Sequence, residues 1–243
     1  MGVFPSDISE AGNLVRRLSP SNNAFFWRDV GGFKDLGPGT ANAFDRSGGI
    51  YGSHDGMPGM WSPSGGFTPF SAPPAPYTKG DALAGNIFGQ ATGRFTGGDG
   101  DASFAWTGTD YQFPALHLFP APPGIESSSG QAINDAGVIA VHGIDADGND
   151  LPVLFHAPYD LASGNLDGQS EFVKILDITA IDDVGHLAGA GRLQDGQVHG
   201  FVMTPGFPLQ AGSAVSILFQ GSTATIRSGR WRSRRSARAS RTS

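Results

Sequence analysis

Short alternating apolar runs recur along the chain, and turns that combine Asn or Asp with Gly separate them. The two clearest copies are residues 131–141 (QAINDAGVIAV) and 178–189 (ITAIDDVGHLAG). In each copy the acidic or amide pair and the Gly favour a tight turn, because they tolerate positive φ and bond to their own backbone. The flanking Val, Ile and Leu favour a pleated, half-buried surface. Each stretch therefore predicts two strands joined by a turn.

Three further copies of this unit can be placed upstream, so the predicted repeat domain covers residues 1–220. The five units are expected near residues 7–37, 42–70, 81–119, 131–177 and 178–209, with turn glycines at Gly12, Gly48, Gly85, Gly137 and Gly185. Each unit offers about four short strands, the content of one propeller blade of about 40–50 residues. The pattern predicts an all-β repeat architecture of short antiparallel strands that is β-propeller-like. It leaves open whether the ring of units is complete.

Some stretches between the clear strands are assigned from composition and position. Residues 81–85 are predicted to form the turn of the third unit, and residues 86–89 the strand that follows it. Residues 71–77 and 120–130 are rich in Pro and are predicted as connectors without a strand. Residues 172–176 are predicted to close the fourth unit.

Three tryptophans, Trp27, Trp61 and Trp106, recur at matched places in the first three units. Aromatic rings can form sugar-binding surfaces by stacking on the apolar faces of sugars. A repeated aromatic at a fixed strand position more simply fills the space between adjacent sheets. We therefore predict that these side chains belong to the core.

The composition supports a packed β protein. The 37 Gly and 17 Pro residues are too many for a helical protein, and 39% hydrophobic residues with 17 Phe argue against disorder. Because Cys is absent, disulfides, thiol catalysis and thiolate metal sites are all excluded.

Charge is distributed unevenly. Residues 227–243 contain seven Arg and no acid, so the rest of the chain is more acidic than the net charge of −6 indicates. We expect no nucleic-acid partner for this acidic body. Residues 221–243 are predicted as a disordered Arg/Ser-rich tail, because this composition cannot build a core. Such a tail could bind nucleic acid or anionic lipid, but an out-of-frame read-through explains its sharp break in composition better.

The N-terminus lacks the basic start and apolar centre of a signal peptide, and no run reaches the roughly 20 apolar residues of a membrane helix. We therefore expect no signal peptide and no transmembrane segment in this chain. Because the chain starts within a repeat, a truncated gene or a misplaced start codon is the expected explanation.

A set of motifs recurs in the same order in most units. They are Ile133-Asn134-Asp135-Ala136-Gly137, Ile181-Asp182-Asp183-Val184-Gly185, Asn23-Ala24-Phe25-Phe26-Trp27, Asp35-Leu36-Gly37 and His199-Gly200-Phe201. Across most of residues 7–209 this arrangement resembles the HAF repeats of bacterial extracellular repeat proteins, which often carry a PEP-CTERM sorting tail. The resemblance implies a propeller-like fold and an extracellular or cell-surface location, and it carries over no catalytic residue. The third unit departs from the pattern in lacking the Asn–Asp turn.

One loop has the residue types of a cation site. Asp145, Asp147, Asn149 and Asp150 could gather oxygens around Ca²⁺, which takes about six to eight such ligands. The spacing differs from that of an EF-hand, and an acidic hairpin turn is the favoured interpretation because Asp-Gly and Gly-Asn promote it. We assign no other cofactor. The six His residues show no metal-binding spacing, and no Gly-x-Ser-x-Gly elbow offers a nucleophile.

These observations favour a non-enzymatic exported or surface repeat protein that serves as a binding or structural scaffold for a protein or a polysaccharide. The alternative is a propeller-type hydrolase or lyase that acts on carbohydrate. Such an enzyme would place acids and histidines at the inner ends of its strands. Convergence of several of Asp135, Asp183, His142 and His186 on one pocket would favour that alternative.

Overall fold

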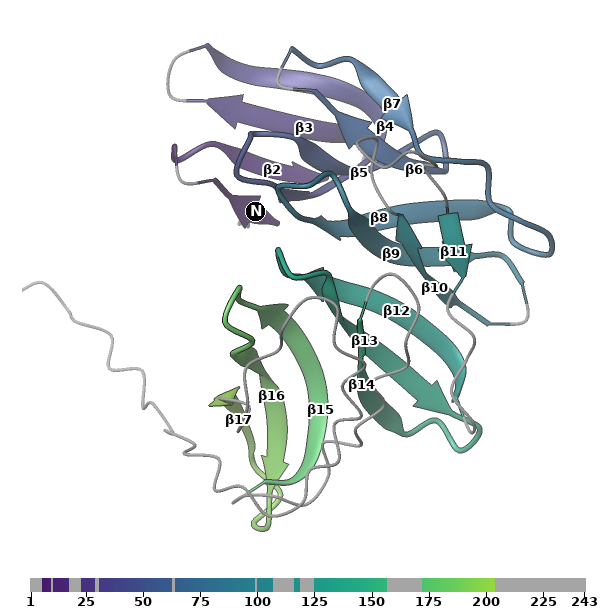
Figure 1. Cartoon of the computed structure of the whole chain (residues 1–243), viewed down its shortest axis with the longest axis vertical. Helices are drawn as coiled ribbons and strands as arrows, with labels where there is room; N and C mark the ends of the chain where they lie inside the picture. The colour runs from purple at the N-terminus through teal and green to yellow at the C-terminus, as the bar shows by residue number, and fades with distance from the viewer. Residues whose placement is uncertain are drawn as a thin grey trace, which may run out of the picture.

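The computed structural model describes residues 6–9, 11–17, 23–28, 31–62, 64–98, 100–106, 116–118, 125–156 and 172–203. Every regular element in these ranges is a β-strand, and each strand pairs with its sequence neighbour in antiparallel fashion within its sheet. Figure 1 shows the strands gathered into units that follow one another along an arc. The all-β, propeller-like repeat architecture expected from the sequence is therefore confirmed.

The first seven strands form one continuous sheet in chain order. They are β1 (Asp7–Ile8), β2 (Leu14–Arg17), β3 (Asn23–Arg28), β4 (Gly32–Phe44), β5 (Ile50–His54), β6 (Met57–Trp61) and β7 (Phe67–Pro69). The first half of β4 pairs with β3 and the second half pairs with β5. We call β1–β3 with the first half of β4 unit 1, and the second half of β4 with β5–β7 unit 2.

The remaining strands form three separate sheets, which we call units 3, 4 and 5. Unit 3 contains β8 (Lys79–Gly85), β9 (Ala91–Thr96), β10 (Ala102–Trp106) and β11 (Leu116–Leu118). Unit 4 contains β12 (Ile125–Ile133), β13 (Val138–Asp145) and β14 (Asp150–His156). Unit 5 contains β15 (Phe172–Ile181), β16 (Leu187–Leu193) and β17 (Val198–Met203).

The core lies in the joints between neighbouring units, where the apolar faces of adjacent sheets meet. The joint between units 1 and 2 buries Val15, Ala24, Phe26, Leu36, Ala41, Ile50 and Trp61. The joint between units 2 and 3 buries Tyr51, Ala82, Ala91, Phe95, Phe104 and Trp106. The joint between units 3 and 4 buries Ala105, Ile125, Ile133, Ile139, Val141 and Val153. Burial of this apolar area in each joint is the main term that holds successive units together.

The repeated tryptophans mostly serve the core, as predicted. Trp61 and Trp106 are 1% and 8% exposed. Phe70 of the segment after β7 stacks on Trp106 with ring centroids 5.0 Å apart, so this ring bridges units 2 and 3. Trp27, the third member of the set, is only partly buried.

Three local predictions are wrong. Residues 81–85 belong to strand β8, and residues 86–89 form the turn, with Gly89 rather than Gly85 at positive φ. Residues 125–130 are part of strand β12, although their serines have low strand propensity. Residues 172–176 open unit 5, because β15 pairs with β16 from Phe172 onward. Serine hydroxyls explain the second error: Ser128 Oγ accepts a bond from the Ser103 N–H of unit 3, at 3.0 Å, so this polar strand is held by its neighbour.

Candidate functional site

Five turns of one design stand at the same end of the five units. They cover residues 9–13, 45–49, 86–90, 134–138 and 182–186, and we call the surface that they form the turn face. In each turn the N–H of the first residue donates to the carbonyl of the fifth, and the N–H of the fourth residue, a glycine, donates to the carbonyl of the first. The fourth residues Gly12, Gly48, Gly89, Gly137 and Gly185 all have positive φ, which explains why glycine recurs there.

The side chain of the first turn residue completes each turn. In the second turn Asp45 Oδ1 accepts the Gly49 N–H at 2.8 Å, and in the fourth Asn134 Oδ1 accepts the Val138 N–H at 2.8 Å. Ser9, Asn86 and Asp182 do the same in the other turns. The recurring Asn, Asp or Ser is thus required locally, because its oxygen satisfies a backbone donor that the turn leaves open.

The turns of units 3, 4 and 5 are also bonded to one another. Asn86 Nδ2 donates to the Asn134 carbonyl at 3.0 Å, and Asn134 Nδ2 donates to the Asp182 carbonyl at 3.0 Å. One residue further on, the Asp135 N–H donates to Asp183 Oδ1 at 3.0 Å. Each partner lies 48 residues along the chain from its donor, so the same contact is repeated from unit to unit.

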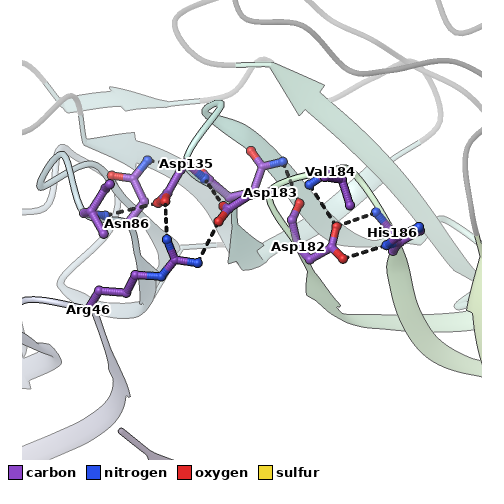
Figure 2. A network of polar contacts seen from close by, with 9 residues as sticks. Arg46, Asn86, Asp135, Asp182, Asp183, Val184 and His186 are labelled. Atoms are coloured by element: carbon purple, nitrogen blue, oxygen red, sulfur yellow. Dashed lines mark hydrogen bonds and ion pairs between the residues drawn. The ribbon is translucent and has the colours of Figure 1, made fainter. Parts of the chain in front are cut away.

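Arg46 joins this series from unit 2. Its guanidinium lies between two carboxylates, with Nη2 at 2.9 Å from Asp183 Oδ2 and Nη1 at 3.4 Å from Asp135 Oδ2 (Figure 2). The arginine reaches past unit 3 to units 4 and 5, so it marks the place where the turns converge. We call Arg46, Asp135 and Asp183 the turn cluster. Its side chains are 60%, 21% and 41% exposed, which makes them accessible to a partner.

A pocket of about 440 Å³ opens beside the turn cluster, between the turns of units 1 and 2. Arg46 belongs to both the cluster and the pocket wall. The other walls include the rings of Phe26 and Phe44, which meet edge to face with centroids 6.2 Å apart, and the Arg28 side chain. The pocket therefore combines aromatic walls with cationic groups.

Two carboxylates of this pocket are already engaged by the fold. Asp7 Oδ2 accepts the Phe44 N–H at 2.8 Å. Asp45 is buried, and its Oδ2 accepts the Tyr51 hydroxyl at 3.2 Å. Burial and the neighbouring Asp45 charge raise the pKa of Tyr51, so its hydroxyl stays protonated and keeps donating. Asp7 thus holds unit 1 to unit 2, and Asp45 orients the turn of unit 2.

The four residues that would have indicated an enzyme are only partly brought together. Asp135 and Asp183 meet, but they meet on Arg46. His186 Nδ1 bonds to Asp182 Oδ2 at 2.7 Å within its own turn (Figure 2). His142 lies in β13, where its two ring nitrogens stand 3.5 Å from Asp150 Oδ1 and 3.6 Å from Asp177 Oδ1, in the joint between units 4 and 5.

The calcium candidates lie in the hairpin turn between β13 and β14. Asp145 Oδ1 accepts the N–H groups of Asp147 at 3.0 Å and Asn149 at 2.7 Å, and Asp145 Oδ2 accepts the Asn149 amide at 3.0 Å. The fourth candidate, Asp150, faces His142 instead. Among the described residues no three His, Cys, Asp or Glu side chains gather closely enough to hold a metal ion. The loop repeats the geometry of the turn face, and calcium binding stays a prediction.

A second polar group lies partly buried in the joint between units 2 and 3. Asp81 of β8 accepts bonds from the Thr40 hydroxyl and, at 2.8 Å, from Asn42 Nδ2. Burial raises the pKa of Asp81, and the bonds from Thr40 and Asn42 offset this effect only in part. Neither Asp81 nor Arg46 belongs to a motif that could be recognised in the sequence. The Asn86 turn could have been found, because Asn86-Ile87-Phe88-Gly89 stands one repeat before Asn134-Asp135-Ala136-Gly137.

The strand order, the repeated turns and the joint cores define a propeller-like repeat protein, and the solved structure of TolB has a similar fold. TolB from Acinetobacter baumannii superposes with a TM-score of 0.53 at 11% identity, over 80% of this chain and 50% of that one. A streptogramin B lyase (TM-score 0.47, 15% identity, 82% and 70% of the two chains) and a gluconolactonase from Xanthomonas campestris (0.47, 13%, 80% and 73%) also match.

The likeness to TolB concerns the fold alone, and this chain spans about half the length of TolB. No family model matches the sequence, and no curated protein matches it. Over the described residues, no helix is long and apolar enough to cross a membrane.

Proposed function

We propose that the protein is a non-enzymatic binding scaffold, exported or held at the cell surface, and that the turn face is its binding face. One observation carries the proposal: the turn face gathers an accessible charged cluster, a pocket and several exposed apolar side chains in one place. The exported location is supported by the resemblance of the units to HAF repeats.

Exposed apolar residues surround the turn cluster. Ile87 and Phe88 of the unit 3 turn are 42% and 50% exposed, and Val184 of the unit 5 turn is 66% exposed. Ile8, which lines the pocket, is 61% exposed. Large apolar side chains that remain in water next to charged groups are typical of surfaces that bind a partner.

The bonding of the acids argues for binding rather than for catalysis. A carbohydrate hydrolase needs a pair of carboxyl groups that face the substrate, one to give a proton and one to act as base or nucleophile. On the turn face Asp45 and Asp182 complete their own turns, and Asp135 and Asp183 share the Arg46 guanidinium. Their oxygens hold the protein together, so the described turn face supports recognition better than bond cleavage.

The test is a panel of immobilised polysaccharides and bacterial surface proteins, read by biolayer interferometry. The Phe88→Ser/Val184→Ser protein should lose most binding that the wild type shows. Val198→Ser/Val202→Ser is the matched control, because these valines of β17 are 54% and 53% exposed outside the turn face. Equal loss in both variants would contradict the assignment of the face. Release of reducing ends or unsaturated sugars from the panel by the wild type would establish the enzyme alternative instead.

A further inference from the structure

The pocket between the turns of units 1 and 2 has the chemistry to hold one particular class of ligand. We propose that it binds a sugar residue that carries a single carboxylate, such as the end of a short uronic-acid chain. This inference rests on the proposed function, since the pocket is part of the turn face.

Arg28 supplies the charge that the ligand would meet. Its guanidinium lies over the ring of Phe26, 4.9 Å from the centroid, and it lines the pocket with an exposed side chain. Within the described residues no carboxylate pairs with Arg28, whereas Asp7 and Asp45 in the same pocket already accept bonds from the protein. A guanidinium that is fixed over an aromatic ring is well suited to take a carboxylate in two parallel bonds.

The other walls suit a sugar ring better than an aliphatic chain. Phe44 offers an apolar surface on which a ring could rest. Around it stand groups that can bond hydroxyls: the side chains of Ser9, Asn13 and Ser47. A polyol with one apolar face satisfies both kinds of wall at once, which a purely apolar ligand would not do.

The overall charge limits the ligand to one or a few carboxylates. The chain carries a net charge of −6, so a dense polyanion would be repelled over most of the surface. A single carboxylate at a chain end can contact Arg28 directly, and solvent and salt screen it from the acids elsewhere on the surface. Nucleic acid and heavily sulfated chains are therefore poor matches, and a short uronate fits.

The probe is digalacturonate, with its dimethyl ester as a neutral ligand of the same ring structure, titrated into the full chain by calorimetry. We expect the ester to bind at least tenfold more weakly than the acid. Arg28→Gln should weaken binding of the acid by on the order of tenfold or more, because a hydrogen bond to a charged group is lost. Arg28→Lys should recover part of that loss. Arg192→Ala, which removes an exposed arginine from unit 5, should leave binding unchanged.

Each other result overturns the inference in a distinguishable way. Equal binding of the acid and the ester would show that the pocket does not recognise the carboxylate. The same conclusion would follow if Arg28→Gln bound the acid as well as the wild type does and had an unchanged melting temperature. If a short glutamate peptide binds as tightly as digalacturonate and with the same dependence on Arg28, the ligand class is an acidic peptide rather than an acidic sugar. If the wild type ignores digalacturonate but the polysaccharide and protein panel still reveals partners lost by Phe88→Ser/Val184→Ser, the uronate inference fails and the binding face stands.

Discussion

Asp81 and Asp182 carry the same carboxyl group in two regions of the molecule, and the fold shifts their pKa values in opposite directions. Asp81 lies in the joint between units 2 and 3, where burial raises its pKa despite bonds from Thr40 and Asn42. Asp182 begins the turn of unit 5. Burial there also acts to raise the pKa, but bonds from His186 and Val184 outweigh it, so the pKa is lowered. Desolvation therefore decides the direction of the pKa shift of Asp81 in the joint, and local hydrogen bonds decide that of Asp182 in the turn.

The largest expected effect is on stability, and it tests whether burial of apolar side chains is the main stabilising term in the joints. Phe95→Ala removes a fully buried ring that packs on Phe104 with centroids 4.8 Å apart. We expect a loss of about 3–5 kcal/mol in the free energy of unfolding, measured by urea denaturation. Val184→Ala on the turn face is the contrast and should change stability by less than about 0.5 kcal/mol. Similar losses in the two variants would erase the distinction between joint and turn.

The next prediction removes the acceptor of a turn. Asp182→Ala should lower the free energy of unfolding by about 1 kcal/mol at neutral pH, because the His186 N–H loses its partner. Asp182→Asn should lose less, since Asn86 and Asn134 fill the same position in their own turns. The two variants are compared by thermal unfolding. An Asn variant as unstable as the Ala variant would show that charge, rather than the acceptor oxygen, matters here.

The pH dependence of the free energy of unfolding distinguishes Asp81 from Asp182, because their pKa values are shifted in opposite directions. The folded-state pKa of Asp182 lies below the ordinary value of 3.8, so its contribution is present above that pH and is lost as the pH falls further. The folded-state pKa of Asp81 lies above 3.8, so its contribution is present below 3.8 and is lost as the pH rises through the folded-state pKa.

Asp81→Asn should therefore gain stability relative to the wild type as the pH rises above about 4. Asp182→Asn should lose relative stability as the pH rises toward about 4 from more acidic values, and the difference should stay level above that pH. The measurement is the free energy of unfolding in urea at a series of pH values. A difference between Asp81→Asn and the wild type that stays constant with pH would contradict the buried-carboxyl interpretation.

The smallest effect concerns the turn cluster. Arg46→Ala should lower the free energy of unfolding by at most about 1 kcal/mol, because ion pairs between exposed side chains contribute little to stability. The loss should shrink further in 1 M salt, where the Debye length falls to about 3 Å. Chemical denaturation at low and high salt checks both statements. A large loss of stability that does not depend on salt would mean that Arg46 mainly stabilises the fold and is not available to a partner.

The periodic pattern of the sequence predicted the fold class well, and strands β6 and β10 have the bounds expected from their apolar runs. The errors in the predicted strands and turns arise where contacts between residues far apart in the sequence determine the local structure. Strand β12 contains three consecutive serines, and the hydroxyls of Ser127 and Ser128 bond to unit 3. Its own residues therefore give little strand signal. Gly85 lies in strand β8, and glycine is needed there for packing rather than for a turn, because a Cβ would stand 2.1 Å from Cζ of Tyr51.

The candidate site was harder to anticipate. Its recurring Asn, Asp and Gly residues are visible in the sequence, but they serve the turns. The residues that could meet a ligand, Arg28 and Arg46, follow no periodic pattern. Arg46 meets Asp183 across 137 residues of chain, and only the curvature of the array brings the two together.

The shared strand β4 has a consequence for how the molecule comes apart. In most repeat arrays a unit can unfold with the loss of only its own contacts and those with its two neighbours. Here the 13-residue strand β4, with Gly39 at a φ of +145°, pairs with β3 through its first half and with β5 through its second half. Unit 1 cannot open without removing the first strand of unit 2. We therefore expect units 1 and 2 to exchange their amide hydrogens as a single cooperative block, and the array to unfold in steps of unequal size.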